Sequence, residues 1–557
     1  MLFAPQLLTD PFLQLPTENS VRVVWFTEFA GSHHIVAYGD NFSQIVTATT
    51  TKLSRAREDQ NSQVEQVYQK PTIREIWRHE AEVRRLIPNT KVPYRVTSVT
   101  EDGKSVSSNT FTLAPKPLPG MPLKILLTSD HQLKPMTAAN LQKVVETVGR
   151  VDAVFFAGDL VNVPDRASEW FDDNRGCAFF QCLQGRANYK LTKNNIETVY
   201  RGGELIQNAP IFTAIGNHEV MGRFSMDSSL DDQFDDTLPR EVAEKIFTPR
   251  ILNADAQKGK GDDWLKDYSF NTNTYEEIFT LPESKEGGKK YYAMTFGDVR
   301  LVVLYVTNMW RTPSLAANAR GKYKECLRTL NNPENWGYGQ HIFEPIKKGS
   351  TQYQWLETEL NSLEFKQAKY KVVMFHHPPH TLGDNIVPAY TDPVQIISRD
   401  ADGEVKAVRY EYPKKQDYII RDLVPLLEKS GVQLVLYGHS HLWNRFISNN
   451  GTHYLETSNV GNSYGAALWD KQRPVPNGYQ EEYTSIGDPN GLDPILPVPA
   501  PLKGCDAKPL PYIASNDITA FSILDTETGT VSSYRWDTRD PELEVVKFDE
   551  FALKSRK

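Results

Sequence analysis

The chain has 557 residues, more than a single hydrophobic core ordinarily holds, so we expect two or more domains. Hydrophobic residues make up 39% and charged residues 24%, a balance typical of a globular protein and not of a disordered or collagen-like chain. The net charge is −8 and there is no long run of Lys or Arg. A nucleic-acid partner is therefore not expected, because binding to that backbone depends on concentrated positive charge.

The chain has no segment typical of membrane insertion or export. Its longest apolar run, at 301–306, is far shorter than the ~18 residues of a membrane-spanning helix, so no membrane partner is expected. The first residues lack a basic region and a small-x-small cleavage site, so no secretory signal is predicted. Four cysteines are too few for a disulfide framework, which favours a cytoplasmic location. Cys177 and Cys182 would still be able to pair in an oxidising compartment.

Residues 1–116 are predicted to form an antiparallel β-sandwich. The period-two alternation that marks half-buried strands occurs in four stretches, at 20–29, 33–39, 92–100 and 104–113. Residues 101–103, Glu-Asp-Gly, supply a hairpin turn between the last two stretches. The linker at 114–122, APKPLPGMP, holds four prolines, which stiffen it and block a helix. We therefore place the domain boundary within it, between residues 116 and 117.

Residues 117–557 show strands alternating with helices. Near-continuous β-branched and aromatic runs, which suit strands buried on both faces, occur at 123–129, 152–159, 210–217, 299–307, 369–376 and 432–439. Helical spacing predicts helices over 137–150, 350–363 and 417–431. Thr137 is the expected N-cap of the first helix, and Gly431 ends the last one. A hairpin is predicted over 518–536, whereas no fold is predicted for the long segments at 163–209 and 221–290.

Five of the buried runs end in side chains that are able to bind metal. These endings are Asp130, Asp159 after Gly158, the GNHE of 216–219, His376 with His377, and the GHSH of 438–441. Because ligands bind beyond the carboxyl ends of strands in α/β sheets, these endings should converge on one crevice. The glycines before Asp159, Asn217 and His439 are expected to allow sharp backbone turns there.

The residue types suit phosphoester cleavage. A carboxylate can bridge two cations, while amide oxygens and imidazoles fill the other coordination positions. Two metals about 3.5–4 Å apart can clamp the attacking and leaving oxygens of a displacement reaction. The pattern therefore indicates a two-metal hydrolase.

The ordered set of five motifs resembles the calcineurin-like metallophosphoesterase superfamily. The sandwich-plus-catalytic layout, the VRVVWFT strand and the GNHE spelling resemble its purple acid phosphatase-like branch, which has a fibronectin type III-like N-terminal domain. The resemblance implies a mixed α+β and α/β chain, in which an antiparallel β-sandwich precedes a four-layer αββα metallophosphoesterase domain. It also implies two divalent metal ions, drawn from Mn, Fe, Zn, Mg and Ca.

Carried over by position, the resemblance assigns a role to each motif residue. It implies that Asp159 bridges the metals, that Asp130 and His441 hold the first metal, and that Asn217, His376 and His439 hold the second. His218 is the implied catalytic residue, binding the phosphate and stabilising or protonating the leaving oxygen, with a metal-bound hydroxide as nucleophile.

Two positions depart from the family pattern. Most members have Asp-x-His in the first motif, and Gln132 replaces that His. Gln132 is expected either to give an amide oxygen to the first metal or to bond to a ligand from outside the coordination sphere. Purple enzymes have a Tyr three residues after the second-motif Asp, where this chain has Asn162. A purple ferric centre is therefore not expected, and a divalent first metal is favoured.

Several other residues carry two interpretations or a purely structural one. His131 is expected to point away from the crevice, because side chains alternate along a strand. His377 and His380 either contact substrate or form part of the rim. The acidic segment 227–236 is either a solvated loop or the entrance to the crevice. Structural roles are expected for the pair Cys177 and Cys182 and for His33, His34, His79, His341 and His453.

The sequence as a whole predicts a metal-dependent hydrolase of phosphoesters, with a phosphomonoesterase acting on a small phosphorylated substrate favoured. One alternative is a phosphodiesterase that uses the same residues. The other is a non-catalytic binding protein with a degenerate metallophosphoesterase domain, for which Gln132 is the argument. The presence of all the other ligand types speaks against the degenerate domain.

Overall fold

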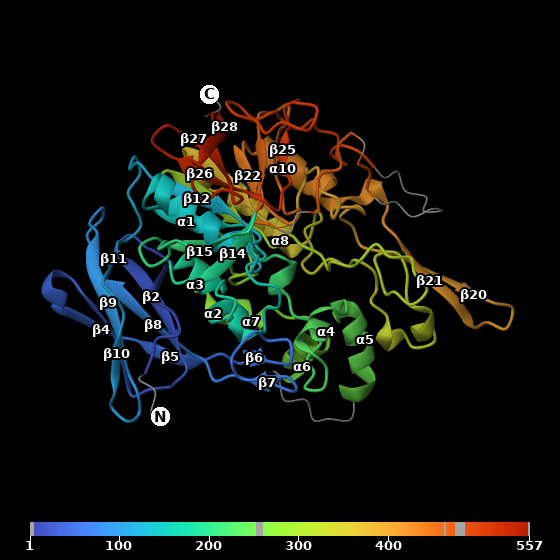
Figure 1. The fold of residues 1–557 in the computed structure, drawn as a ribbon. Coiled ribbons are helices and arrows are strands. Elements are labelled where there is room, and N and C mark those ends of the chain that lie inside the picture. The colour runs from blue at the N-terminus through green and yellow to red at the C-terminus, as the bar shows by residue number, and fades with distance from the viewer. Residues whose placement is uncertain (1–4, 252–259, 462–463, 470, 474–484, 555–557) are drawn as a thin grey trace.

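The computed structural model describes residues 5–251, 260–461, 464–469, 471–473 and 485–554. Figure 1 shows a β-rich N-terminal part, in blue, beside a larger body that contains two long sheets and their helices. None of the helices in the described ranges combines the length and the apolarity that a membrane crossing requires.

The N-terminal part consists of two antiparallel sheets. The first has the order β1 (Phe12–Gln14), β2 (Ser20–Thr27), β8 (Trp77–Arg84) and β5 (Thr49–Lys52). The second has the order β10 (Ser105–Ser107), β9 (Val92–Val99), β3 (His33–Tyr38) and β4 (Gln44–Thr47), with β11 (Phe111–Leu113) also paired to β9. A short ribbon of β6 (Arg57–Glu58) and β7 (Thr72–Ile73) leaves the first sheet. The predicted antiparallel sandwich is confirmed.

Strand β2 joins the sandwich to the rest of the protein. Val23 and Trp25 pack between the two N-terminal sheets, whereas the alternate residues Val24 and Phe26 belong to the main core of the larger body. Both faces of this strand are therefore buried, so its apolar content exceeds simple alternation. The proposed boundary at residues 116 and 117 lies between β11 and the next strand.

Several details of the sandwich differ from expectation. The single strand predicted over 104–113 is split, because the backbone N–H of Val96 donates to the side-chain Oγ of Ser108 instead of to a ladder carbonyl (3.1 Å). Strand β8 was not predicted, since its sequence WRHEAEVR is rich in charge. Its Arg78 and Glu80 are held by an ion pair within the sheet (2.6 Å).

His79 on β8 is buried at the centre of the sandwich as a neutral side chain. Its ring stacks on His34 at 3.6 Å and bonds to the hydroxyls of Thr27 (2.8 Å) and Thr50 (2.9 Å). Burial, together with the charges of His34 and Arg78, lowers the pKa of His79 to about 3. The structural roles expected for His34 and His79 fit this packing.

Acid is expected to destabilise the protein through His79. The unfolded chain takes up a proton near pH 6.5 and the folded chain does not, so stability is complete above that pH and is lost as pH falls towards the folded pKa. At pH 5 the loss should be about 2 kcal/mol. Denaturant unfolding at pH 7.5 and 5.0 should show a smaller difference for His79→Gln than for the wild type. Equal differences would contradict the assignment.

The larger body contains a six-stranded and a seven-stranded sheet. The six-stranded sheet has the order β16 (Ile211–Thr213), β13 (Ala153–Phe156), β12 (Lys124–Thr128), β26 (Ile518–Asp525), β27 (Thr530–Asp537) and β28 (Val546–Ala552). The seven-stranded sheet has the order β17 (Tyr292–Phe296), β18 (Val299–Val303), β19 (Tyr370–Met374), β22 (Leu434–Tyr437), β24 (His453–Thr457), β23 (Trp443–Ile447) and β25 (Tyr512–Ile513). Strands β12, β13 and β16 are parallel, as are β18, β19, β22 and β24.

The side-chain alternation of these strands builds four layers. In β19, Val372 and Met374 join the core between the two sheets, whereas Val373 packs with the helical residues Leu356 and Leu427. Each such strand thus buries one face against the other sheet and one against helices. The αββα arrangement predicted from the resemblance is confirmed.

The α-helices of the described residues are short, and the longest have 12 residues. The α-helices are α1 (Thr137–Val148), α2 (Ala167–Phe171), α3 (Phe179–Leu183), α4 (Leu230–Phe234), α5 (Arg240–Ile251), α6 (Lys260–Tyr268), α7 (Asn273–Ile278), α8 (Thr351–Leu360), α9 (Leu363–Gln367) and α10 (Val424–Lys429). Single turns occur at η1 (Asp40–Phe42), η2 (Asn217–Glu219), η3 (Leu327–Thr329), η4 (Pro333–Asn335) and η5 (Lys414–Gln416), and η6 (Ile419–Leu423) is a π-turn that leads into α10.

The helix predictions are correct in position and wrong in two details. Met136, not Thr137, occupies the N-cap position of α1, because the Thr137 hydroxyl is used to donate to the His131 carbonyl (3.1 Å). The helix predicted over 350–363 is interrupted, because Ser362 caps a new turn by accepting from Phe365 N. Gly431, with φ 76°, follows the end of α10 as predicted.

The long interrupting segments form their own elements. Segment 163–209 contains α2, α3 and the hairpin β14 (Tyr189–Lys193) with β15 (Ile196–Tyr200), and segment 221–290 contains α4 to α7. A further hairpin, β20 (Val394–Arg399) with β21 (Val405–Glu411), projects from the body in Figure 1. All four cysteines are free thiols, so Cys177 and Cys182 are unpaired.

Candidate metal centre

The five motifs follow five parallel strands of the two sheets. Asp130 and Asp159 come directly after β12 and β13, and Asn217 begins the single turn η2 after β16. His376 and His439 follow β19 and β22 of the facing sheet. The polar residues at the carboxyl ends of both sheets therefore lie close together, as predicted from the sequence.

Asp159 lies at the centre of this arrangement. Its Oδ1 accepts from the backbone N–H of His218 (2.9 Å), and its Oδ2 accepts from Nε2 of Gln132 (2.9 Å). Nε2 of His376 lies 3.2 Å from the same Oδ2. Nδ1 of His376 bonds to the Ala157 carbonyl (2.8 Å), which directs Nε2 towards Asp159.

Two groups of potential metal ligands share Asp159. One group is Asp159, His376 and His439, and the other is Asp130, Asp159 and His441. In each group the ligand atoms lie within 4.8 Å of one another, and all the residues are buried. Asp159 is common to both groups.

The polar atoms left without partners fit a pair of cations. Oε1 of Gln132, Oδ1 of Asn217 and Nε2 of His439 are buried and make no hydrogen bond in the described part of the chain. Orphaned buried acceptors are costly unless something else satisfies them. All three atoms are metal-ligand types in the sequence-predicted set, and oxygen with imidazole nitrogen suits divalent ions such as Mn, Fe and Zn.

The electrostatics of the centre favour an ionised Asp159. Burial alone raises its pKa, but the charges of His376 and His218 lower it below the ordinary value. Burial likewise opposes protonation of His376, yet Asp159 raises the pKa of this imidazole to about 10. Because a ligating imidazole must be neutral, metal binding should release a proton from His376.

The backbone is strained where the predicted ligands sit. Asp130, Gln132, Asp159, His439 and His441 all have positive φ, at 56°, 39°, 57°, 80° and 54°. Non-glycine residues seldom adopt this region, and clusters of such residues are typical of functional sites. The surrounding hydrogen bonds hold them there, including those from His439 N to both oxygens of Asp130 (3.1 and 3.0 Å).

Close packing against neighbouring atoms explains the three motif glycines better than a need for sharp backbone turns. Only Gly158 has positive φ (96°), and a Cβ there would lie 2.7 Å from Gly216 N and 2.8 Å from His376 Nδ1. A Cβ at Gly216 would collide with the Asp159 carboxylate, and one at Gly438 with that of Asp130. The expectation of a sharp turn is therefore borne out at Gly158, whereas the other two are explained by close packing against ligands.

Two buried carboxylates support the motifs, and the sequence analysis gave them no role. Glu219 accepts from the backbone N–H of Asp159 (2.8 Å), Leu160 (2.7 Å) and Gly216 (2.7 Å), which ties two motifs together. Glu456 accepts from Ser440 N (2.8 Å) in the last motif. Burial raises the pKa of each carboxyl to about 8. Glu219 is the last residue of the GNHE motif, so the sequence did point to it. Glu456 lies in β24, outside every motif.

His218 faces a small cavity next to the ligand groups. Its Nδ1 donates to the Asn162 carbonyl (2.6 Å), and its Nε2 lies 4.0 Å from Asp159 Oδ2. The ring stacks on Phe234 at 4.9 Å, and the side chain keeps 23% of its surface exposed. Asn162, where purple enzymes have Tyr, uses its side-chain amide to donate to the Gln132 carbonyl (2.9 Å).

The cavity has a volume of about 220 Å³. Besides the candidate ligands Gln132, Asp159, Asn217, His439 and His441, it is lined by Lys134, Asn162, His218, Phe234, Asp235, Trp310, Asn385 and Tyr464. Phe234 and Asp235 belong to the acidic segment 227–236, so part of that segment does line the entrance. Lys134, Trp310 and Tyr464 were not predicted, because each lies outside the motifs and only the tertiary fold brings it here.

The remaining candidate histidines have packing partners. His131 points away from the centre, as predicted: its Nε2 bonds to Thr128 Oγ1 (2.9 Å) and its ring packs on Phe156. His377 is buried behind His439, with 4.9 Å between the ring centroids. His380 pairs with Asp488 (2.8 Å) and is buried, so it forms no exposed rim.

Gln132→His is expected to tighten binding at the first site. Gln132 already contacts Asp159, and its free Oε1 is the weaker ligand type compared with an imidazole. Zn²⁺ affinity, measured by competition with a chelating dye, should rise about tenfold for one of two sites. Gln354→His is the matched control, because Gln354 is exposed on α8 and does not line the cavity. An unchanged zinc affinity in Gln132→His would mean that residue 132 does not face the metal.

Comparison with known proteins agrees with this geometry. The family model for calcineurin-like phosphoesterases matches residues 123–442, more than half of the chain and the whole span from β12 to His441. No curated protein is significantly similar to the chain in sequence. Among solved structures, purple acid phosphatase PPD1 from yellow lupin (Lupinus luteus) seeds shares the fold, with a TM-score of 0.51 and 14% identity. That alignment covers 97% of this chain and 74% of the lupin chain.

Proposed function

Because the chain belongs to the calcineurin-like phosphoesterase family, we propose that it is a metal-dependent phosphomonoesterase with a dinuclear centre. The observation that supports this most directly is that two groups of ligands meet at one carboxylate, Asp159. Asp130, Gln132 and His441 would hold the first metal, and Asn217, His376 and His439 the second. The bound cations would supply Lewis-acid activation of a water molecule and neutralise phosphoryl charge.

His218 is the proposed acid on the substrate side. Its Nδ1 proton is committed to the Asn162 carbonyl, so Nε2 can donate only when the imidazole is positively charged. In that form it would stabilise phosphoryl oxygens and pass its proton to the leaving oxygen. Phe234 holds the ring from one side, which keeps Nε2 directed into the cavity.

Lys134 supports a monoester as substrate. It is the one cationic Lys or Arg among the residues that line the 220 Å³ cavity, and it lies two residues after Gln132. A phosphomonoester carries up to two negative charges and a diester only one, so a cation in the cavity favours the monoester. Phe234, Trp310 and Tyr464 leave limited room, which suits a single organic substituent on phosphorus.

The test is a comparison of metal-loaded enzyme on nitrophenyl phosphate and bis(nitrophenyl) phosphate. The wild type should contain two metals and prefer the monoester. Lys134→Met should reduce kcat/KM for the monoester about 10–100-fold, since a charged hydrogen bond to phosphate is lost, and should change the diester much less. Lys190→Met, on the surface of β14, is the control.

Three results would contradict the proposal. A preference for the diester would favour the phosphodiesterase, and equal losses on both esters would remove Lys134 as the selective group. A wild-type protein that binds metal and cleaves neither ester would favour the non-catalytic alternative.

A further inference from the structure

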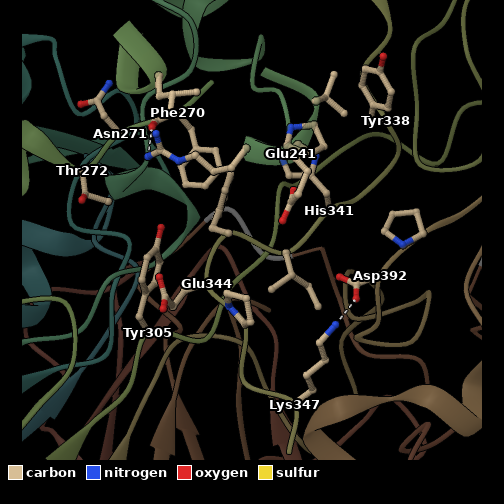
Figure 2. A pocket seen from close by; sticks show the side chains of 18 of the residues that line it. Glu241, Phe270, Asn271, Thr272, Tyr305, Tyr338, His341, Glu344, Lys347 and Asp392 are labelled. Atoms are coloured by element: carbon tan, nitrogen blue, oxygen red, sulfur yellow. Dashed lines mark hydrogen bonds and ion pairs between the residues drawn. The ribbon is translucent and has the colours of Figure 1, made fainter. Parts of the chain in front are cut away.

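A second, larger cavity lies apart from the candidate metal centre. Its volume is about 840 Å³, and it is lined by the start of α5, the end of α6, residues 341–345 and residues 392–395. None of the candidate metal ligands lines it. Figure 2 shows Phe270, Tyr305 and Glu344 on one side of the cavity, His341 and Glu241 across from them, and Lys347 with Asp392 at its edge.

Five basic side chains line this cavity, although the chain as a whole is acidic. Arg240, Lys245, Lys266, Lys290 and Lys347 line it. Only Lys347 pairs with a carboxylate of a described residue, Asp392, at 3.2 Å. Two carboxylates remain, Glu241 and Glu344, so four cations face two possible anions. Such an excess of positive charge raises the local concentration of anionic ligands.

Two residues that line the cavity also carry polar groups without partners. The Tyr305 side chain is 2% exposed, and its hydroxyl makes no hydrogen bond with the described part of the chain. Nδ2 of Asn271 is likewise buried without a partner. Unsatisfied buried donors are rare in folded proteins, and a bound ligand is one way of satisfying them. Both groups are able to donate to an anionic oxygen.

Aromatic rings supply the apolar part of the walls. The Arg240 guanidinium lies 4.3 Å from the Phe270 ring centroid and donates to the Phe270 carbonyl (2.6 Å). Phe343 packs against Phe270 at 4.9 Å. The accessible edges of these two buried rings would contact a flat ring of a ligand, next to the cations. The volume lies within the range of about 300–1,000 Å³ that is usual for small-molecule sites and is much larger than an inorganic anion requires.

We propose that this cavity is a binding site for a small organic anion that carries a planar ring, with the anionic group at Arg240, Lys266 and Lys290 and the ring beside Phe270 and Phe343. The anionic oxygens would accept from the Tyr305 hydroxyl. The site is separate from the candidate metal centre and does not depend on the proposed function.

The proposal is tested by calorimetric binding to metal-free protein, in which phosphoester hydrolysis is not expected to interfere. The probes are adenosine 5′-monophosphate, orotate, adenosine and inorganic phosphate. Adenosine 5′-monophosphate and orotate should both bind if the site accepts a carboxylate as well as a phosphate. Only adenosine 5′-monophosphate should bind if the site requires a phosphate. Adenosine and inorganic phosphate should each bind at least about tenfold more weakly, because each lacks half of the recognised features.

Variants locate the binding. Lys266→Gln combined with Lys290→Gln should weaken the ring-bearing anion about tenfold or more, whereas Lys406→Gln, an exposed control on β21, should not. Lys134→Gln should leave the affinity unchanged, because it lies in the smaller cavity. Loss of binding in Lys134→Gln with retention in the double variant would place the probe at the metal centre and overturn the proposal. Absence of binding by both ring-bearing anions would overturn it as well.

Discussion

Asp159→Asn is expected to abolish two-metal binding and to reduce kcat/KM on a phosphomonoester by about a thousandfold or more. Asp159 is the one residue common to both ligand groups, so its replacement removes a charge from both sites at once. An amide has one coordinating oxygen and no charge, and the loss of charge stabilisation from the cations is worth several kcal/mol. Metal content by elemental analysis and steady-state kinetics measure the two effects.

The matched control for this variant is Asp235→Asn. Asp235 lines the same small cavity but belongs to neither ligand group. It should keep two metals per chain. If Asp159→Asn retains two metals and full activity, the centre is not organised around this carboxylate.

His218→Ala is expected to lower kcat by about 10²–10⁴-fold while both metals stay bound. His218 is in neither ligand group, and its Nε2 faces the cavity from a ring held by Asn162 and Phe234. The variant therefore separates acid catalysis from metal binding, which Asp159→Asn cannot do. Loss of metal in His218→Ala would instead make it a structural support of the centre.

The pH profile gives a second measurement for His218. Burial lowers its pKa below the ordinary 6.5, although Asp159 partly opposes this. Only the protonated ring can donate from Nε2, so the share of competent enzyme falls as pH rises through that pKa. Wild-type kcat should therefore decline from acidic towards neutral pH, and His218→Ala should lose this part of the profile. His33→Ala, an exposed histidine on β3, should behave as the wild type does.

Much of the fold could be predicted because its strands carry strong local patterns. The runs that became β12, β13, β18, β19 and β22 are almost entirely apolar, and burial on both faces leaves few alternatives. Strand β8 escaped prediction because charged residues alternate along it with the buried Ala81 and Val83, and ion pairs hold those charges within the sheet. Helices α2, α3, α4 and α7 of the segments 163–209 and 221–290 also escaped, since helices of five or six residues depend on tertiary packing and not on propensity.

The candidate metal centre, like the fold, could be predicted only in part. The motifs from Asp130 to His441 predicted which residue types gather at the centre, because parallel strands bring their carboxyl ends to one edge. The orientation of each side chain could not be predicted from the motifs. These orientations depend on contacts between residues 27 to 60 positions apart. Examples are the bond from Gln132 to Asp159, the bond from the Asn162 amide to a carbonyl, and the bonds by which Glu219 joins two motifs.

The sequence by itself determined the run of strands and helices and the residues able to bind metal, because periodicity and residue chemistry are local properties. The resemblance of its motifs to a known family implied the class of protein and the αββα layers. Only the tertiary structure decided which side chains share a space. It brought Lys134, Phe234 and Trp310 around His218, and it enclosed the cationic cavity between α5, α6 and residues 341–345. The reason is physical: a cavity is formed by side chains from distant segments, and no pattern within one segment encodes what the others contribute.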